Sequence, residues 1–296
     1  MKTLLVTGGT DGIGKGIATH YLKKGDRVIV IGSSVAKGNL YLSESKQLGA
    51  EERAIFLQAD LSSVKENKRI IEEVKSRFDS LDMVVFSAAS HKIKKEYTET
   101  QEGFEFNFGL SYLSRFDFSF GFKELMEKSD APIIVNICAP GMNGTVDLND
   151  IQNKNDYNGS KARYHGSRLN DLLGVAFADT DTVKKIKYVL FNPWAVQTEG
   201  MLETIENPMK KLFTKLIFKI IGKPVDQAII PIIELLDKPP KPNLMAYIQR
   251  KEVSLTKKTF DRENAQRLYK NTVQLLVRDL GWDCHLQKSS VRKALR

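Results

Sequence analysis

Residues 3–14 read Thr-Leu-Leu-Val-Thr-Gly-Gly-Thr-Asp-Gly-Ile-Gly, and this stretch decides the fold. An apolar run, Thr3–Thr7, is followed by a glycine-rich turn that opens a helical pattern over Gly12–Lys24. Glycines let such a turn close tightly against a pyrophosphate, and the helix N-terminus adds partial positive charge. The T-G-x-x-x-G-x-G spacing on a first strand–helix turn therefore predicts a dinucleotide site and not a simple turn. The expected contacts are Gly8, Thr10, Asp11, Gly12, Ile13 and Gly14.

Short apolar runs alternate with longer helical patterns through the next part of the chain. Predicted strands are Arg27–Ile31, Ala54–Gln58, Met83–Phe86, Pro132–Ile137 and Lys187–Phe191, and predicted helices include Ser63–Phe78 and Gly103–Lys128. Strands that are apolar on both faces belong to parallel sheets covered by helices on both sides. The alternation predicts an α/β fold, a doubly wound parallel sheet of the Rossmann type.

The pattern changes after Pro193. Residues 201–221 are apolar with Lys211, Lys215 and Lys219 at four-residue steps, which puts three ammonium groups on one helix face. We expect a lid over an apolar pocket at about residues 199–224, with a helix on a membrane surface as the alternative. A helix at Gln227–Leu236, a strand at Leu244–Ile248 and a helix at Asp261–Leu276 should follow. The expected organisation is one dinucleotide-binding domain, residues 1–277, and a basic tail, residues 278–296.

Composition excludes several classes of protein. The 296 residues contain 45 Lys and Arg against 36 Asp and Glu, a net charge of +9, and only two cysteines, Cys138 and Cys284. Two cysteines cannot build a disulfide framework, and no stretch reaches the roughly 18 apolar residues that span a bilayer. The basic excess lies on scattered lysines without zinc-finger spacing, so we expect no nucleic-acid partner and no metal. The expected location is cytoplasmic, without membrane association.

Further motifs make the chain resemble the short-chain dehydrogenase/reductase family over nearly its whole length, to about Leu276. Asp60-Leu61 matches the family's acidic position after the third strand, which contacts adenine. Ser87, Ala88 and Ala89 stand where the family has its Asn-Asn-Ala-Gly turn, of which only Ala88 is kept. Residues 103–110 and 264–275 are similar to the retinol-dehydrogenase-like branch. The resemblance implies hydride transfer between a nicotinamide cofactor and a carbonyl or alcohol.

Cofactor choice depends on the end of the second strand. An NAD enzyme places a carboxylate there, whereas an NADP enzyme needs a nearby cation. Here the strand ends in Gly32-Ser33-Ser34, with Lys37 close behind, and Lys15 is a second candidate cation. The absence of a carboxylate favours NADP(H), although the family's usual arginine is missing at Ser33, and NAD(H) stays an alternative.

Two tyrosines compete for the role of catalytic acid, which the family gives to a tyrosine with a lysine four residues later. On a helix this spacing puts both side chains on one face, where the cation lowers the tyrosine pKa. Tyr157 with Lys161 matches the motif. Tyr164 with Arg168 has the same spacing, with arginine in place of the lysine. The interval from Tyr164 to Pro193 and the helical sequence after Arg168 both fit the family better, so we favour Tyr164 as acid/base, held by Arg168.

The remaining family positions are altered. The family's helix asparagine falls at Ser111, and its substrate-binding serine falls at Ala139, which has no donor for a carbonyl oxygen. Pro193 and Thr198 match the family's cofactor loop, where Thr198 alternatively caps a helix, and Trp194 replaces the usual glycine.

We therefore predict an oxidoreductase that acts on a small apolar carbonyl or alcohol substrate, with homo-oligomerisation left open. The alternative is a catalytically impaired dinucleotide sensor or partner-binding protein on the same frame.

Overall fold

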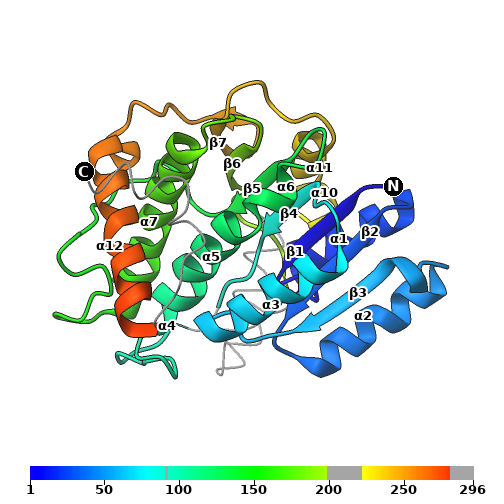
Figure 1. Ribbon diagram of the computed structural model, residues 1–296, viewed down its shortest axis with the longest axis horizontal. Coiled ribbons are helices and arrows are strands. Elements are labelled where there is room, and N and C mark those ends of the chain that lie inside the picture. Colours follow the sequence, from blue (N-terminus) through cyan, green and yellow to red (C-terminus); the bar gives the residue numbers. More distant parts are fainter. Residues whose placement is uncertain (91–92, 199–221, 281–296) are drawn as a thin grey trace.

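An eight-stranded sheet forms the centre of the molecule (Figure 1). The strands are β1 Thr3–Thr7, β2 Arg27–Gly32, β3 Ala54–Gln58, β4 Met83–Phe86, β5 Ile133–Ile137, β6 Lys187–Asn192, β7 Leu244–Ile248 and β8 Lys251–Glu252. Their spatial order is β3-β2-β1-β4-β5-β6-β7-β8. All neighbours pair in parallel except β7 and β8, which form an antiparallel hairpin. This computed structural model describes residues 1–90, 93–198 and 222–280.

The predicted doubly wound sheet is confirmed. Strands β1 and β4 are buried at every residue, because helices cover both faces of the sheet. The chain runs outward from β1 through β2 to β3, and then returns to place β4 on the other side of β1. The order therefore reverses between β1 and β4, and a crevice at the carboxyl ends of these strands is where such sheets bind ligands.

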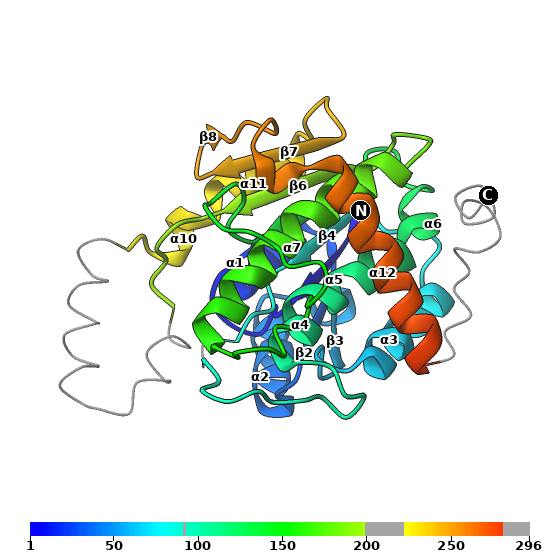
Figure 2. The same ribbon diagram turned by 90° about the vertical axis from the view of Figure 1, so that its left-hand side faces the viewer.

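Helices form a layer on each face (Figure 2). Their bounds are α1 Gly12–Lys24, α2 Val35–Gln47, α3 Val64–Arg77, α4 Phe106–Phe108, α5 Ser114–Gly121, α6 Lys123–Met126, α7 Gly159–Thr180, α10 Val225–Ala228, α11 Ile230–Asp237 and α12 Arg262–Leu280. Alternate strand residues point to opposite faces, so the sheet has two cores. Residues of α1, α2 and α11 fill one core, and residues of α3, α5 and α7 fill the other. Helix α12 packs against α7 on the outside of the second layer.

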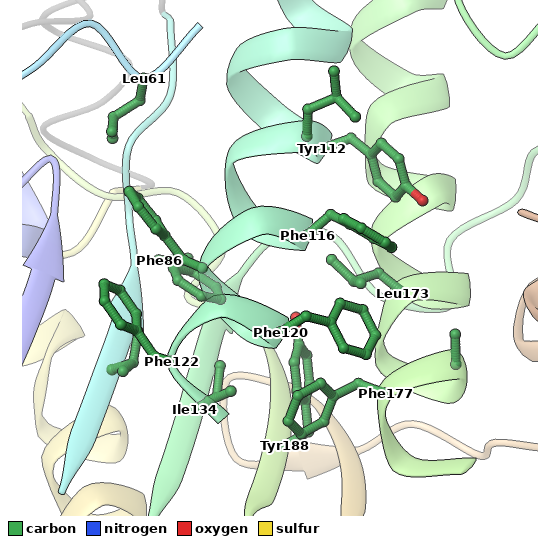
Figure 3. Close-up of a cluster of buried hydrophobic side chains, with 14 of the residues drawn as sticks. Leu61, Phe86, Tyr112, Phe116, Phe120, Phe122, Ile134, Leu173, Phe177 and Tyr188 are labelled. Carbon is green, nitrogen blue, oxygen red and sulfur yellow. The ribbon is translucent and has the colours of Figure 1, made fainter. Parts of the chain in front are cut away.

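Aromatic side chains dominate the core between the sheet and α5 and α7 (Figure 3). The ring centroids of Phe116 and Phe120 on α5 are 4.8 Å apart, and Phe120 continues to Phe177 on α7 at 5.4 Å. Phe177 in turn lies 5.2 Å from Tyr188 of β6. Such tilted pairs add to the free energy of burying apolar area. This packing fixes α7, which carries the predicted catalytic tyrosine, against the sheet.

Two predicted helices differ from the structure, and a third helix was not predicted. The helix expected over residues 103–128 begins only at Phe106 and is interrupted by a π-helical turn, Gly109–Leu113, and a further break at Phe122. The helix expected over 227–236 is divided into α10 and α11, since Pro231 has no amide hydrogen to continue it. Helix α2 was not predicted, because it lacks a continuous apolar face and contains Gly38. That glycine admits the ring of Phe56, whose atoms would lie 2.1–2.4 Å from a Cβ there.

Residues 199–221 and 281–296 lie outside the described residues, so the expected lid and most of the expected basic tail lie there too. In the part of the chain that is described, no helix combines the length and the apolar character that a membrane span requires.

Candidate active site

The glycine loop joins β1 to α1 in the conformation that its sequence predicts. Gly8 and Gly12 have positive φ values of 67° and 51°, which residues with a Cβ rarely adopt. A Cβ on Gly14 would lie 2.4 Å from both the Gly8 carbonyl oxygen and Ser87 Oγ, so only glycine lets α1 approach the sheet this closely. Asp11 caps α1 by accepting a hydrogen bond of 2.7 Å from the Gly12 amide. The loop thus places the N-terminus of α1 beside the carboxyl ends of β1 and β4.

A cavity of about 550 Å³ opens above this loop, at the point where the strand order reverses. It is lined by Gly8, Thr10, Asp11, Gly12, Ile13, Gly14, Gly32, Ser33, Ser34, Lys37, Ala59, Asp60, Leu61, Ser87, Ala88, Ala89, Ser90, Phe106, Leu110, Ile137 and Thr198. Every residue that the sequence predicts to contact the cofactor is among them except Pro193. The volume lies in the range of small-molecule and cofactor sites.

Hydrogen bonds hold the end of β4 against the glycine loop. The Ser87 hydroxyl donates to the Thr7 carbonyl oxygen at 2.7 Å, and Thr7 Oγ1 accepts from the amides of Ser87 and Ala88 at 3.2 and 3.3 Å. Farther along the cavity wall, Asp60 Oδ1 accepts from the Ser62 amide and hydroxyl. These contacts fix the wall on which the family resemblance places the adenine.

The end of β2 carries hydroxyls and a cation. Ser34 caps α2, since its oxygen accepts a hydrogen bond from the Lys37 amide at 3.3 Å, and its own hydrogen is left to donate. The Lys37 ammonium forms an ion pair of 2.6 Å with the Asp11 carboxylate across the cavity wall. The other candidate cation, Lys15, pairs with Glu44 at 2.8 Å and lines a neighbouring groove instead of this cavity.

A dinucleotide fits this site by its donor groups and by its space. The turn presents the amide-rich start of a helix to the cavity, which suits a pyrophosphate. The end of β2 carries no carboxylate of its own, and Lys37 pairs with Asp11; Asp60, after β3, is the other acidic residue of the cavity lining. A Cβ on Gly12 would approach Thr198 Cγ2 to 3.0 Å, so the glycine keeps space open between α1 and the loop after β6.

Tyr164 and Arg168 occupy successive turns of α7, but their side chains have different environments. Tyr164 is 67% exposed, so its hydroxyl is open to an incoming substrate. Arg168 is buried, and its guanidinium donates to the carbonyl oxygens of Ala139 and Met142 and pairs with Asp171 at 3.2 Å. We expected Arg168 to hold Tyr164. Instead its long side chain reaches the loop after β5, and it fixes that loop to α7.

Tyr157 and Lys161 do not share a helix face. Tyr157 precedes the N-cap of α7, Asn158, so the four-residue spacing is not helical here. The Tyr157 hydroxyl donates to Glu105 Oε1 at 2.9 Å, and burial together with this carboxylate raises the pKa of Tyr157 to about 12. A raised pKa opposes the role of a proton-exchanging group near neutral pH. The geometry is therefore less suited to catalysis at Tyr157 than at Tyr164.

The other altered positions lie near α7. The Ser111 carbonyl oxygen accepts from Asn170 Nδ2 at 2.8 Å, and Ser111 Cβ would lie 3.6 Å from a Cβ on Gly166. Ala139 contributes its carbonyl oxygen to Arg168. Burial raises the pKa of the neighbouring Cys138 thiol to about 12, which keeps it protonated. None of these three residues lines the cavity, and Tyr164 and Arg168 do not line it either.

A buried polar network beneath the cavity escaped the sequence analysis. The Arg115 guanidinium donates to Asn136 Oδ1 at 2.6 Å and to the Ala88 carbonyl oxygen at 3.3 Å, and Asn136 donates to Asn170 at 2.8 Å. Burial lowers the pKa of Arg115. The network joins the ends of β4 and β5 to α7, and the signal that could have revealed it is an arginine inside an otherwise aromatic helix.

Among residues 1–90, 93–198 and 222–280, no group of three or more His, Cys, Asp or Glu side chains is placed to hold a metal ion.

Comparison with known proteins agrees with this architecture. Residues 2–204 match the family described as short chain dehydrogenase. Human polyprenol dehydrogenase is 27% identical over 173 residues, which are 57% of this chain and 52% of the human protein. A hydroxynaphthalene reductase-like protein of Metarhizium guizhouense is 30% identical over 199 residues, which are 67% of this chain and 69% of the fungal protein. The chain thus matches about half the length of the human relative.

Solved structures share the fold. A short chain dehydrogenase from Burkholderia cenocepacia in complex with NADP superposes with a TM-score of 0.63 and 17% identity, covering 83% of this chain and 95% of the other. L-Sorbose reductase from Gluconobacter frateurii, complexed with NADPH and L-sorbose, gives a TM-score of 0.65 and 15% identity, covering 83% and 94%.

Proposed function

The chain belongs to the short-chain dehydrogenase family, and on this premise we propose that it is an NADP(H)-dependent oxidoreductase acting on an apolar carbonyl or alcohol. The observation that carries the proposal is the cavity at the switch point of the sheet, lined by the glycine loop and by the end of β2. We further propose that residues 1–277 form one catalytic domain and that residues about 199–224 act as its lid.

The preference for NADP(H) is supported by charge. The end of β2 offers Ser33, Ser34 and Lys37 and no carboxylate, and a ribose phosphate needs hydroxyl donors and a cation. Two structural neighbours were solved in complex with NADP or NADPH. Asp11 lies within 2.6 Å of the Lys37 ammonium and competes with such a phosphate for it, so the preference depends on this ion pair.

The proposed mechanism assigns proton transfer to Tyr164. A nicotinamide dinucleotide held by the glycine loop and the end of β2 would supply the hydride chemistry of the reaction in either direction. In the reductive direction the Tyr164 hydroxyl donates its proton to the carbonyl oxygen, and in the oxidative direction the phenolate takes the alcohol proton. Arg168 is a positioning residue, because it fixes the loop Ala139–Met142 against α7.

The substrate class is proposed from the site and from two relatives. The loops beside the cavity carry apolar residues, and the relatives are named for a polyprenol and for a hydroxynaphthalene, both hydrophobic molecules. Ala139 offers a substrate only a methyl group where the family has a hydroxyl. Binding would therefore depend on apolar contact more than on hydrogen bonds to the reacting oxygen.

The test is a titration of the purified protein with NADPH and, separately, with NADH, followed by nicotinamide fluorescence. We expect NADPH to bind more tightly, and we expect turnover when geranylgeraniol with NADP⁺, or retinal with NADPH, is then supplied. Binding of NADPH without turnover on a broad panel of aldehydes, ketones and alcohols would contradict the proposal in favour of a dinucleotide sensor. Failure of both cofactors to bind would contradict it entirely.

A further inference from the structure

Trp194 combines two features that each cost free energy. Its side chain is 57% exposed, although indole is among the most apolar surfaces a residue can present. Its backbone has φ +67°, in the left-handed region that a residue with a Cβ rarely adopts. Nothing in the packing of the core requires either feature. Strain that the fold does not need is often found at functional sites.

The surrounding hydrogen bonds hold the residue in this conformation. Asn192, the last residue of β6, accepts a hydrogen bond of 2.8 Å from the Trp194 amide through its side-chain oxygen. Just beyond, Lys223 donates its amide to the Ala195 carbonyl at 3.0 Å, and the Gln197 amide donates to the Lys223 carbonyl at 2.9 Å. The loop is therefore tied at both ends of Trp194, and the indole is presented on a fixed support.

Trp194 lies at the carboxyl ends of the strands, on the same side of the sheet as the cavity. Strand β6 pairs with β5 so that Phe191 lies opposite Ile137, which lines the cavity. Trp194 follows Phe191 by three residues, and Thr198, a further cavity residue, follows Trp194 by four. The indole thus stands in the segment that links two parts of the cavity wall.

Other exposed apolar side chains occur in equivalent positions. Ile93 follows β4 and is 46% exposed, and Met142 follows β5 and is 38% exposed. Helix α7 follows the carboxyl end of β5 and leads to the amino end of β6. Its first half, which contains Tyr164, therefore lies toward the carboxyl ends of the strands. Single exposed apolar residues need no explanation, but four at one sheet edge, around a site for a small molecule, indicate an apolar binding surface.

We propose that Trp194 is a specificity-determining residue that binds the hydrocarbon chain of an extended substrate outside the cavity. The inference rests on the proposed function, since it names the part of an apolar substrate that this loop recognises. An indole held in place gives a large contact area at little entropic cost. A short alcohol does not reach it, so Trp194 distinguishes substrates by chain length.

The variant that tests this is Trp194→Gly, which removes the indole and relieves the backbone. Lys184→Gly is the matched control, because Lys184 also has a positive φ, 53°, but lies near the opposite end of β6. Prenol, geraniol and geranylgeraniol are the probes, since they share one reactive end and differ in chain length. For Trp194→Gly we expect the KM for geranylgeraniol to rise about tenfold, while the KM for prenol changes less than about twofold. Lys184→Gly should leave both unchanged.

A second readout needs no turnover. The chain has two tryptophans, so Trp282→Phe leaves Trp194 as the only indole emitter. Geranylgeraniol should shift the Trp194 emission to shorter wavelength, and prenol should not. A cofactor titration that fails would overturn the proposed function, whereas an unmoved emission, or equal KM changes for all three alcohols, would overturn the role of Trp194. A thermal midpoint lowered by Trp194→Gly and not by Lys184→Gly would show that the indole is structural, and would overturn it as well.

Discussion

The Tyr157 hydroxyl donates a hydrogen bond of 2.9 Å to the Glu105 carboxylate, an interaction between the N-terminal side of α7 and the N-cap of α4. Glu105 also accepts from the Phe108 amide at 2.7 Å and from Asn107 Nδ2 at 2.9 Å. Burial, and then this carboxylate, favour the protonated tyrosine and raise its pKa. A tyrosine held in this way is poorly suited to exchange a proton near neutral pH, whereas Tyr164 is exposed to solvent, which is why we propose Tyr164 as the proton donor.

Tyr164→Phe should lower kcat by at least about 100-fold, because the proton donor is removed while the ring is kept. Dissociation constants for the cofactor should stay within about twofold, since Tyr164 does not line the cavity. Tyr157→Phe is the control and should retain kcat within about threefold. Steady-state kinetics with one substrate distinguish the two tyrosines. Loss of turnover in Tyr157→Phe with activity kept in Tyr164→Phe would mean that Tyr157 is the catalytic acid.

Gly14→Ala should destabilise the protein by about 1–3 kcal/mol, because its Cβ would overlap the Gly8 carbonyl and Ser87 Oγ. Gly166→Ala on α7 is the matched substitution. There the nearest atom, Ser111 Cβ, is 3.6 Å away, so we expect a gain of about 0.5–1 kcal/mol from helix propensity. Urea denaturation of both variants measures the difference, and equal effects would contradict the close approach of α1 to the sheet.

The seven parallel strands could be predicted from the sequence almost to the residue, because each is a mainly apolar run, whereas the two-residue strand β8 was not predicted. The residues of the glycine loop and of the end of β2 that line the cavity could be predicted from the glycine spacing and the strand end, and the other predicted lining residues only from the resemblance to the family. The partners of Arg168 could not be predicted. Helical spacing defines which Cα atoms share a face, but an arginine side chain is long enough to leave that face for Ala139 and Met142. The pairing of Lys37 with Asp11 likewise joins residues that only the tertiary fold brings together.

The buried pair of Arg168 and Asp171 gives a prediction about mutational stability. Arg168→Met should cost about 3–5 kcal/mol, because it leaves a buried carboxylate without its cation. The double variant Arg168→Met/Asp171→Asn should recover part of that loss. Chemical denaturation of the single and double variants gives the coupling free energy. If the double variant is no more stable than Arg168→Met, the ion pair is not the reason for the loss.

The same pair predicts how stability depends on pH. Burial raises the pKa of Asp171 from its usual 3.8 to about 7, against the opposing effect of Arg168. The folded state therefore holds this proton more tightly than the unfolded chain, so the contribution to the free energy of unfolding is fully present below about pH 4. It is lost as the pH rises through about 7. Asp171→Asn should weaken the pH dependence of the urea midpoint over this range. Asp130→Asn, which changes an exposed surface acid, should leave that dependence unchanged. An unchanged profile in Asp171→Asn would show that another group causes the dependence.

The ion pair between Lys37 and Asp11 should set the cofactor preference. Asp11→Asn keeps the helix cap, because asparagine caps as well as aspartate, and it removes the negative charge 2.6 Å from the Lys37 ammonium. The affinity for NADPH should then rise about twofold to fivefold relative to NADH, as expected for a partly exposed charge pair. Lys37→Met should move the ratio in the opposite direction.

The control for this prediction is Lys46→Met, which breaks the exposed pair with Glu51 on the far end of α2 and should leave the ratio unchanged. Both cofactors are titrated against each variant by nicotinamide fluorescence at one salt concentration, because screening weakens exposed pairs. A ribose phosphate is the only group by which the two cofactors differ, so a change in their ratio reports on that phosphate alone. Equal changes for NADPH and NADH in Asp11→Asn would mean that Asp11 acts on the shared pyrophosphate through the start of α1, and that Lys37 does not discriminate between them.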